Sequence, residues 1–396
     1  MRQLRRRGYM HFKLGSYKSD WKDIKLPEGA SDIQKSENAE DNRRISQFIS
    51  DILLSENLTI LTGLGTSLSA TKQNIKGESK AVAPKMSDLW KAVKDTYGKE
   101  FETVLKKVKY DVEVSGENIE LLLSRCQLFQ KLNPTDDVKK FINSSEEVVV
   151  KLCDFVDDAV KIGAHEMFLR KVARRGARLP RTQIFTTNYD LCFEKAASRS
   201  RFILVDGFSS YVPPEFDGAY FNYDFVTRGG EQTHPEFVPN VFQLHKLHGS
   251  IDWEEIDGVI QKTSNRKRPC IIYPQDGKYE SSYSTPYLEL MGRFQSVLRK
   301  QNLGLIIVGF GFNDNHISHP IIQALKSNVH LKVLIVDPTL KTTGNKYLKQ
   351  IESLAESGDW RIGMMAGTFE DLASYLPDIQ KESALDLHYK RVNEVI

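Results

Sequence analysis

The amino-acid sequence predicts an α/β protein in which a parallel β-sheet carries helices on both faces and a mainly helical domain is inserted. Uninterrupted apolar runs such as Leu303–Val308 and Val333–Val336 are typical of strands buried on both faces. Helical stretches fall between several of these runs, and this alternation indicates a parallel sheet covered on each side. With 396 residues, 40% of them hydrophobic and 27% charged, the chain can bury a substantial core.

The first part of the chain predicts an extension, a helix and a strand. Residues 1–45 are polar and mixed in charge, so we expect a loosely packed N-terminal extension. Arg44–Ser55 places its apolar residues at helical spacing. The β-rich run Leu58–Thr62 follows and stops in Gly63–Ser67, which predicts a buried strand that feeds a glycine turn.

A helical insertion is expected at 76–179, where the strand pattern gives way to helical spacing. One helix is predicted over Glu117–Leu132 and a longer one over Ser145–Arg175. The second opens with Ser144–Glu147, which fits a capping box.

Strands return after residue 180, so the main domain is predicted to comprise 46–75 and 180–378. Helices are expected at Tyr287–Gln301 and Gly344–Ser357, a long loop at 206–240, and a C-terminal tail at 379–396. The predicted strands are Gln183–Thr187, Phe202–Val205, Val241–Leu247, Cys270–Tyr273, Leu303–Gly309, Leu331–Asp337 and Arg361–Ala366.

The net charge, the absence of long apolar runs and the cysteine spacing disfavour several classes of protein. The formal charge of +3 is too small to indicate nucleic-acid binding by itself, and no apolar run approaches the roughly 20 residues that span a bilayer. The four cysteines lie far apart without a Cys-x-x-Cys pair, which favours reduced thiols in a cytoplasmic protein and no zinc site. Met10 could be the native start as well as Met1.

The segment Gly63–Ser67 is a candidate phosphate-binding turn. Glycines allow a diphosphate to approach the backbone, and the next helix offers free N–H groups to it. Thr66 and Ser67 could add hydroxyl donors. The full Gly-x-Gly-x-x-Gly spacing is missing, so a tight strand-to-helix turn is an equally good explanation.

Polar residues also follow the next predicted strands, where open α/β sheets place their ligand sites. In Thr186–Asp190, Asn188 offers a donor and an acceptor, and Asp190 offers a carboxylate; a turn that caps the following helix is the alternative. His248 lies at a strand end before a glycine and titrates near neutral pH, although a lone histidine is more often structural. We interpret His245 as that structural case.

A further glycine turn, Gly309–His316, follows another apolar strand, and Asp337 and Thr368 occupy similar positions. Together, in this order, these motifs resemble those of the sirtuin (silent information regulator) family. That family's pattern runs from a Gly-Ala-Gly-x-Ser-type loop through Thr-x-Asn-x-Asp to Leu-His-Gly and then a glycine-bearing strand end. The resemblance covers about residues 46–75 and 180–376 and implies a Rossmann-like NAD-binding fold.

The resemblance also implies roles for individual residues. His248 would be the general base at the nicotinamide ribose, with Asn188 and Asp190 as further catalytic residues around that sugar. Residues that would bind the rest of NAD are Gly63, Gly65, Thr66, Ser67, Thr187, Gly309, Gly311, Asn313, Asp337, Thr368 and Phe369. Among these, Asp337 is a candidate for the adenosine ribose, and Thr368 and Phe369 for the adenine edge.

Two departures separate this sequence from protein-deacylating sirtuins. The Cys-x-x-Cys zinc pairs are missing, since Cys270 is the single cysteine after His248. The first loop continues as Leu68–Lys72 in place of Gly-Ile-Pro-Asp-Phe-Arg. The motifs instead look like the zinc-free bacterial branch, whose members deplete NAD in anti-phage defence, often beside a HerA-type ATPase.

Three hypotheses follow. The first is an NAD hydrolase that releases nicotinamide and ADP-ribose as a regulated defence effector; the second is NAD-dependent protein deacylation or ADP-ribosyl transfer; the third is a non-enzymatic NAD or ADP-ribose sensor. A homo-oligomer and an ATPase partner are expected, with no membrane contact, and with nucleic acid engaged only through a partner. A positioned base contributes about 10²–10⁴-fold to a rate, so His248→Ala is expected to nearly abolish turnover while leaving folding intact.

Overall fold

The computed structural model describes residues 10–15, 21–23, 32–74, 77–176, 179–227, 236–263, 269–271 and 286–379. Residues 1–9, which include the cluster of arginines, and the predicted tail after 379 lie outside the described residues.

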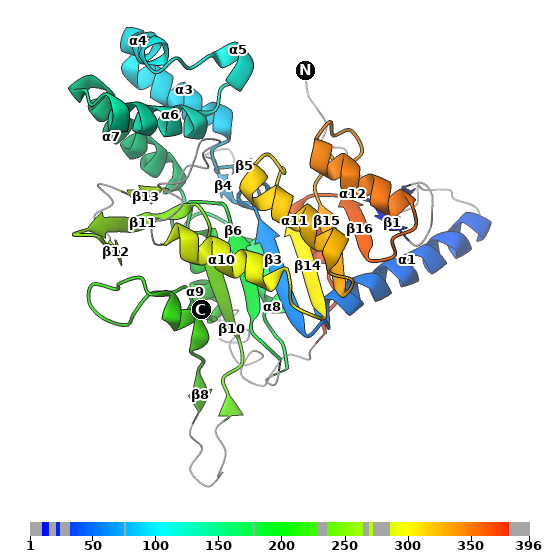
Figure 1. Cartoon of the computed structure of the whole chain (residues 1–396). Coiled ribbons are helices and arrows are strands. Elements are labelled where there is room, and N and C mark those ends of the chain that lie inside the picture. Colours follow the sequence, from blue (N-terminus) through cyan, green and yellow to red (C-terminus); the bar gives the residue numbers. More distant parts are fainter. Residues whose placement is uncertain are drawn as a thin grey trace.

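A nine-stranded sheet forms the centre of the molecule, in the order β2-β1-β16-β15-β14-β3-β6-β10-β7 (Figure 1). The seven strands from β16 to β7 are parallel to one another. Their bounds are β3 (Asn57–Thr62), β6 (Thr182–Thr186), β7 (Ile203–Val205), β10 (Val241–Lys246), β14 (Leu303–Val308), β15 (Leu331–Val336) and β16 (Ile362–Ala366). The predicted parallel sheet is therefore confirmed.

The edge of this sheet is closed by the N-terminal segment. β1 (His11–Leu14) pairs antiparallel with β16, and β2 (Lys22–Asp23) pairs antiparallel with β1. The segment expected to be a loosely packed extension thus contributes two strands of the sheet. Phe12 and Leu14 are buried in the core, so the short alternation of apolar residues here marks a real edge strand.

Helices cover both faces of the sheet, and each face has its own hydrophobic cluster. Strand residues alternate between the two clusters: in β14, Ile306 and Val308 join the first, whereas Leu305 and Ile307 join the second. The first face carries α1 (Asp32–Leu53), α8 (Gly163–Val172), α9 (Cys192–Ser200) and α13 (Phe369–Tyr375); the second carries α10 (Tyr287–Val297), α11 (Asn315–Ser327) and α12 (Lys346–Glu356).

A separate group of helices rises above the carboxyl ends of the strands (Figure 1). It is reached through the hairpin β4 (Thr71–Gln73) and β5 (Ser79–Ala81), and its hydrophobic cluster also includes Tyr189, Leu191, Ile251 and Ile271 from outside the group. Its helices are α3 (Met86–Tyr97), α4 (Lys99–Lys107), α5 (Val112–Ser115), α6 (Ile119–Leu132) and α7 (Asp136–Cys153). α8, also inside the predicted insertion, packs against α9 and α13 beneath the sheet.

The helix predicted over Ser145–Arg175 was wrong. α7 begins at Asp136 with two acidic residues in its first turn, ends at Cys153, and is separated from α8 by residues 154–162. Ser144–Glu147 lies in the middle of α7, and Ser145 is fully buried, so this segment is not a helix start. The Ser-x-x-Glu pattern misled because it marks a cap only where the preceding chain is not already helical.

The loop predicted at 206–240 contains short elements. They are a 3₁₀ helix (η2, Gly218–Asn222), the strands β8 (Val226–Thr227) and β9 (Glu236–Phe237), with 228–235 outside the described residues. A three-stranded sheet follows, formed by β11 (Gly249–Ile256), β12 (Val259–Lys262) and β13 (Pro269–Ile271). Within the described part of the chain, no helix has the length and apolar character needed to span a bilayer.

Candidate active site

A cavity of about 600 Å³ opens at the carboxyl ends of the parallel strands. The chain places β6 on one side of β3 and β14 on the other, so the crevice between β3 and β14 is a point where strand order changes direction. Open α/β sheets bind their ligands at such points. The volume is within the range of about 300–1,000 Å³ that small-molecule sites occupy.

Two glycine turns meet backbone to backbone at the floor of this cavity. The N–H of Gly65 donates to the carbonyl oxygen of Gly309 at 2.9 Å. A Cβ at Gly65 would lie 2.5 Å from the Gly309 Cα, and one at Gly309 would lie 2.6 Å from the Gly65 Cα. Gly309 also has a φ of +64°, which side chains rarely adopt. Glycine is therefore required at both positions by close packing as well as by conformation.

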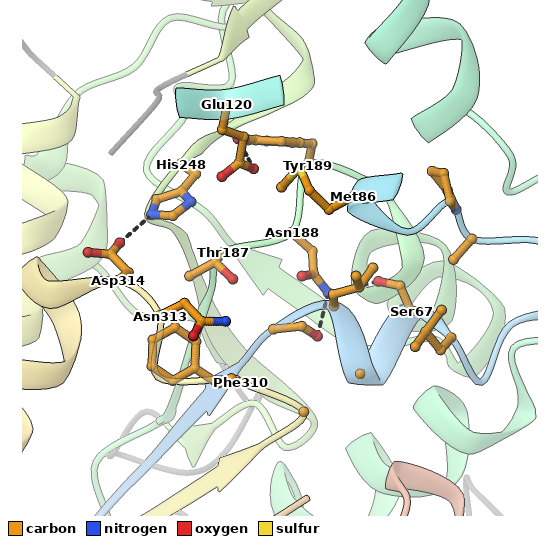
Figure 2. Close-up of a pocket in the computed structure, with 18 of the residues that line it drawn as sticks. Ser67, Met86, Glu120, Thr187, Asn188, Tyr189, His248, Phe310, Asn313 and Asp314 are labelled. Atoms are coloured by element: carbon orange, nitrogen blue, oxygen red, sulfur yellow. Dashed lines mark hydrogen bonds and ion pairs between the residues drawn. The ribbon is translucent and has the colours of Figure 1, made fainter. Parts of the chain in front are cut away.

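Asn188 is fixed to the first of these turns by its side-chain amide. Its Nδ2 donates to the carbonyl oxygen of Gly63 at 2.9 Å and contacts Thr66 Oγ1 at 3.1 Å and Ser67 Oγ at 2.7 Å. Because a backbone carbonyl only accepts, this contact assigns the nitrogen to that side. The amide oxygen has no hydrogen-bond donor among the described residues and is left for the cavity (Figure 2).

Asp190 orders the serine that holds Asn188. Ser67 Oγ donates to Asp190 Oδ2 at 2.5 Å, and the backbone N–H of Cys192 donates to Asp190 Oδ1 at 2.9 Å. Both carboxylate oxygens thus have donors, although Asp190 also lines the cavity. Asp190 and Ser67 therefore position the Asn188 side chain through a chain of hydrogen bonds.

His248 lies across the cavity from Asn188 and pairs with Asp314. Its Nε2 is 3.0 Å from Asp314 Oδ2, and Asp314 also caps α11 by accepting from the His316 N–H at 2.8 Å. Burial lowers the pKa of His248, but the hydrogen bond and charge of Asp314, helped by the charge of Glu120, outweigh burial and raise that pKa. Burial raises the pKa of Asp314, but the hydrogen bond and charge of His248, together with the smaller contributions of His316, outweigh burial and lower that pKa.

Lys246, two residues before His248, forms hydrogen bonds with the loop that carries Asn188. Its buried ammonium donates to the carbonyl oxygens of Tyr189 and Asp190 at 3.2 and 2.6 Å and pairs with Glu194 at 2.9 Å. This contact ties the end of β6 to the end of β10, so the two strand ends that carry Asn188 and His248 are held together.

The helical group above the sheet forms the roof of the cavity, to which α3, α6 and α7 contribute side chains. Glu120 of α6 accepts a hydrogen bond from the Tyr189 hydroxyl at 2.7 Å, which connects the roof to the Asn188 loop. The roof residues that line the cavity are Met86, Leu89, Asn118, Glu120, Leu121 and Cys153. Burial raises the pKa of Cys153 to about 12, so this thiol stays protonated at neutral pH and is a poor nucleophile.

Most residues predicted for the site line this one cavity. They are Gly63, Gly65, Ser67, Thr187, Asn188, Asp190, His248, Gly309, Gly311, Asn313 and Asp337. Thr66 lies just beneath, in contact with Asn188. Thr368 and Phe369 do not line it: Thr368 caps α13, and Phe369 packs against His165 and Phe168 in the core.

Three residues of the site were missed in the sequence. Asp314 was within a quoted motif but was not recognised as the partner of His248. Tyr189 and Glu120 form a pair across 69 positions, which no local pattern reveals. All four cysteines of the chain are described and unpaired, and in the described residues no three His, Cys, Asp or Glu side chains gather as metal ligands.

Comparison with known proteins adds one family match. Residues 182–353, less than half of the chain, match the model of the SIR2-like domain. No curated protein matches the chain. Several solved structures match, among them an ADP-ribose complex of a mutant Sir2 homologue. That match has 14% identity, covers 79% of this chain and 95% of the other, and has a TM-score of 0.33.

Proposed function

We propose that this protein is an NAD hydrolase that cleaves the bond between nicotinamide and ribose. The observation that carries the proposal is the convergence of Asn188 and His248 on one cavity whose floor is two close-packed glycine turns. The match of residues 182–353 to the SIR2-like domain supports the same assignment.

The glycine turns are suited to the diphosphate of NAD. Gly63, Gly65, Gly309 and Gly311 line the cavity and carry no side chain, so a ligand can approach the backbone closely at these positions. Asp337, on the β15 side, is our candidate for the adenosine ribose. Its Oδ1 is held by the N–H and hydroxyl of Thr339 at 2.7 and 2.6 Å, which fixes the carboxylate in place.

The proposed reaction is a hydrolysis in which all atoms and charges balance. The bond from ribose C1 to the nicotinamide nitrogen breaks, and its electron pair leaves with neutral nicotinamide. An oxocarbenium-like sugar results, as in glycoside hydrolysis. Water adds to C1 and loses a proton, so NAD⁺ and water give ADP-ribose, nicotinamide and H⁺.

Asn188 and His248 have complementary parts in this step. With its amide nitrogen bound to the glycine turn, Asn188 presents its oxygen to the attacking water or a ribose hydroxyl. His248 Nε2 faces Asp314, which leaves Nδ1 to accept the proton. Asp190 supports Asn188 through Ser67, and its negative charge lies near the developing positive charge on the sugar.

We further propose that the enzyme is a regulated NAD-depleting effector of bacterial anti-phage defence, assembled as a homo-oligomer beside a HerA-type ATPase. The resemblance of its motifs to the zinc-free bacterial branch supports this role. An unregulated NAD hydrolase would also exhaust its host, so activity must be controlled. Light scattering of the purified chain, alone and with the ATPase, tests the assembly; a lone monomer in both cases would contradict it.

Incubation of the purified protein with NAD tests the reaction. We expect free ADP-ribose and nicotinamide without any acceptor, and a loss of at least about 100-fold in Asn188→Ala because the nucleophile is no longer positioned. Asn133→Ala, an exposed asparagine after α6, is the matched control. Nicotinamide release only with an acyl-lysine peptide would indicate deacylation, and tight binding without turnover would indicate a sensor.

A further inference from the structure

Apart from histidines, the ionisable side chains that line the cavity are mostly carboxylates. Besides His248 and His316, the described lining residues include four carboxylates and no lysine or arginine; the carboxylates belong to Glu120, Asp190, Asp314 and Asp337. A dinucleotide diphosphate is anionic, so an acidic lining does not favour that part of the ligand. The lining instead suits a ligand that brings a positive charge to one end of the cavity.

Three of the four carboxylates each have two hydrogen-bonding partners within the protein. Asp314 pairs with His248, Asp190 accepts from Ser67 and the Cys192 N–H, and Asp337 accepts from Thr339. These contacts offset or fix their charges. Glu120 differs because it has a single donor in the described residues, the Tyr189 hydroxyl.

Glu120 extends from the roof into the same end of the cavity as His248. It lies in the first turn of α6, where the helix dipole stabilises a negative charge, and its Oε1 accepts from the Tyr189 hydroxyl at 2.7 Å. Its second oxygen has no donor among the described residues. Figure 2 shows the carboxylate beside Tyr189 and above the His248 ring.

The negative charge of Glu120 affects the pKa of His248. Burial lowers the pKa of His248, and the charge of Glu120 is one of the contributions that raise it, after those of Asp314. The carboxylate and the imidazole line the same cavity. A positive charge placed between them would interact with Glu120 in the same way.

We propose that Glu120 is a specificity-determining residue that selects the positively charged nicotinamide ring of the oxidised dinucleotide over the neutral dihydronicotinamide ring. The inference rests on the proposed function, which places the nicotinamide end of NAD beside His248. In this proposal Glu120, from the roof, interacts with the charge of the nicotinamide leaving group. Asn188 and His248, from the strand ends, act on the ribose.

Binding of the two dinucleotides tests this inference without requiring turnover. Dissociation constants for NAD⁺ and NADH are measured by calorimetry in an Asn188→Ala background, which suspends hydrolysis. In that parent we expect NAD⁺ to bind more tightly than NADH. Glu120→Gln keeps an oxygen for the Tyr189 hydroxyl but removes the charge, and should cut the preference for NAD⁺ about tenfold, chiefly by weakening NAD⁺.

Glu117→Gln is the matched control, because it removes a charge three residues away on an exposed side chain that does not line the cavity. The preference should be unchanged there, and thermal unfolding should show that all variants are folded. A preference that Glu120→Gln leaves intact, or equal weakening of both dinucleotides, would overturn the role of Glu120 while the proposed function stands. If neither dinucleotide binds the parent, the proposed function fails as well.

Discussion

One buried histidine lies in the interior of β10 and a second lies at its carboxyl end. The pKa values of the two side chains are shifted in opposite directions. His245 is stacked between the rings of Phe185 and Phe221, with ring centroids 4.3 and 4.0 Å apart, and neither ring nitrogen has a hydrogen-bond partner within the described residues. Burial, with a smaller contribution from the charge of Arg293, lowers its pKa well below the usual value. His248, three residues later, has a raised pKa beside Asp314.

Burial therefore does not decide the charge of a histidine in this protein, since both side chains are almost fully enclosed. The difference is the carboxylate: Asp314 offers a partner to the protonated ring, and the aromatic rings around His245 do not. The sheet interior keeps its histidine neutral and inert, and the strand end makes one available for proton transfer.

The largest expected effect separates the two histidines by turnover. In His248→Ala, Asp314 would be buried without its histidine partner, so a substitution that keeps a donor is the sharper test. His248→Gln retains a donor for Asp314 and should lower kcat about 10²–10⁴-fold in a nicotinamide-release assay. His245→Phe, which keeps a flat ring in the stack, should retain wild-type kcat. Equal losses of kcat in His248→Gln and His245→Phe would contradict the different roles of the two histidines.

Acid should weaken the fold through the inert histidines. Burial lowers the pKa of His165 to about 4, so between pH 6.5 and 4 the unfolded chain binds a proton that the folded chain excludes. Stability is therefore lost as pH falls through this range, and His165 alone should cost on the order of 2 kcal/mol at pH 5. Urea unfolding at pH 7.5 and pH 5 measures the loss. His165→Leu should reduce it, and an identical loss in this variant would contradict the assignment.

The smallest expected effect concerns the partner of His248. Asp314→Asn removes the two largest contributions that raise the pKa of His248, so burial, which lowers it, is opposed only by the charge of Glu120. The acid limb of the pH profile of kcat/KM should move to lower pH, and kcat at pH 8 should fall about tenfold because the protonated ring loses a charge-assisted hydrogen bond. A lower kcat with an unmoved acid limb would mean that Asp314 supports the fold alone.

The strand ends were predictable from the sequence because their signals are local. Apolar runs such as Leu303–Val308 end in polar or glycine residues, and parallel packing brings those ends to one edge. That reasoning predicts that Asn188 and His248 lie at one edge of the sheet, and both line the cavity there. His245 was also correctly separated from His248, since only the latter precedes a glycine at the strand end.

The partners of these residues were not predictable, because each pair joins distant parts of the chain. His248 and Asp314 are 66 positions apart, and Lys246 and Glu194 are 52 apart. The roof posed a different problem, since helical periodicity indicates which face is buried but not what it covers. Glu120 therefore looked like one more polar residue on an amphipathic helix.

The position of β14 has a consequence for synthesis of the protein. This strand lies between β15 and β3, although the ribosome makes it after β6, β7 and β10. A nascent chain that stops before Leu303 therefore lacks the centre of the sheet, the second glycine turn and the carboxylate opposite His248. Such a chain lacks part of the cavity lining, so the site can be completed only after β14 and the glycine turn that follows it have been made.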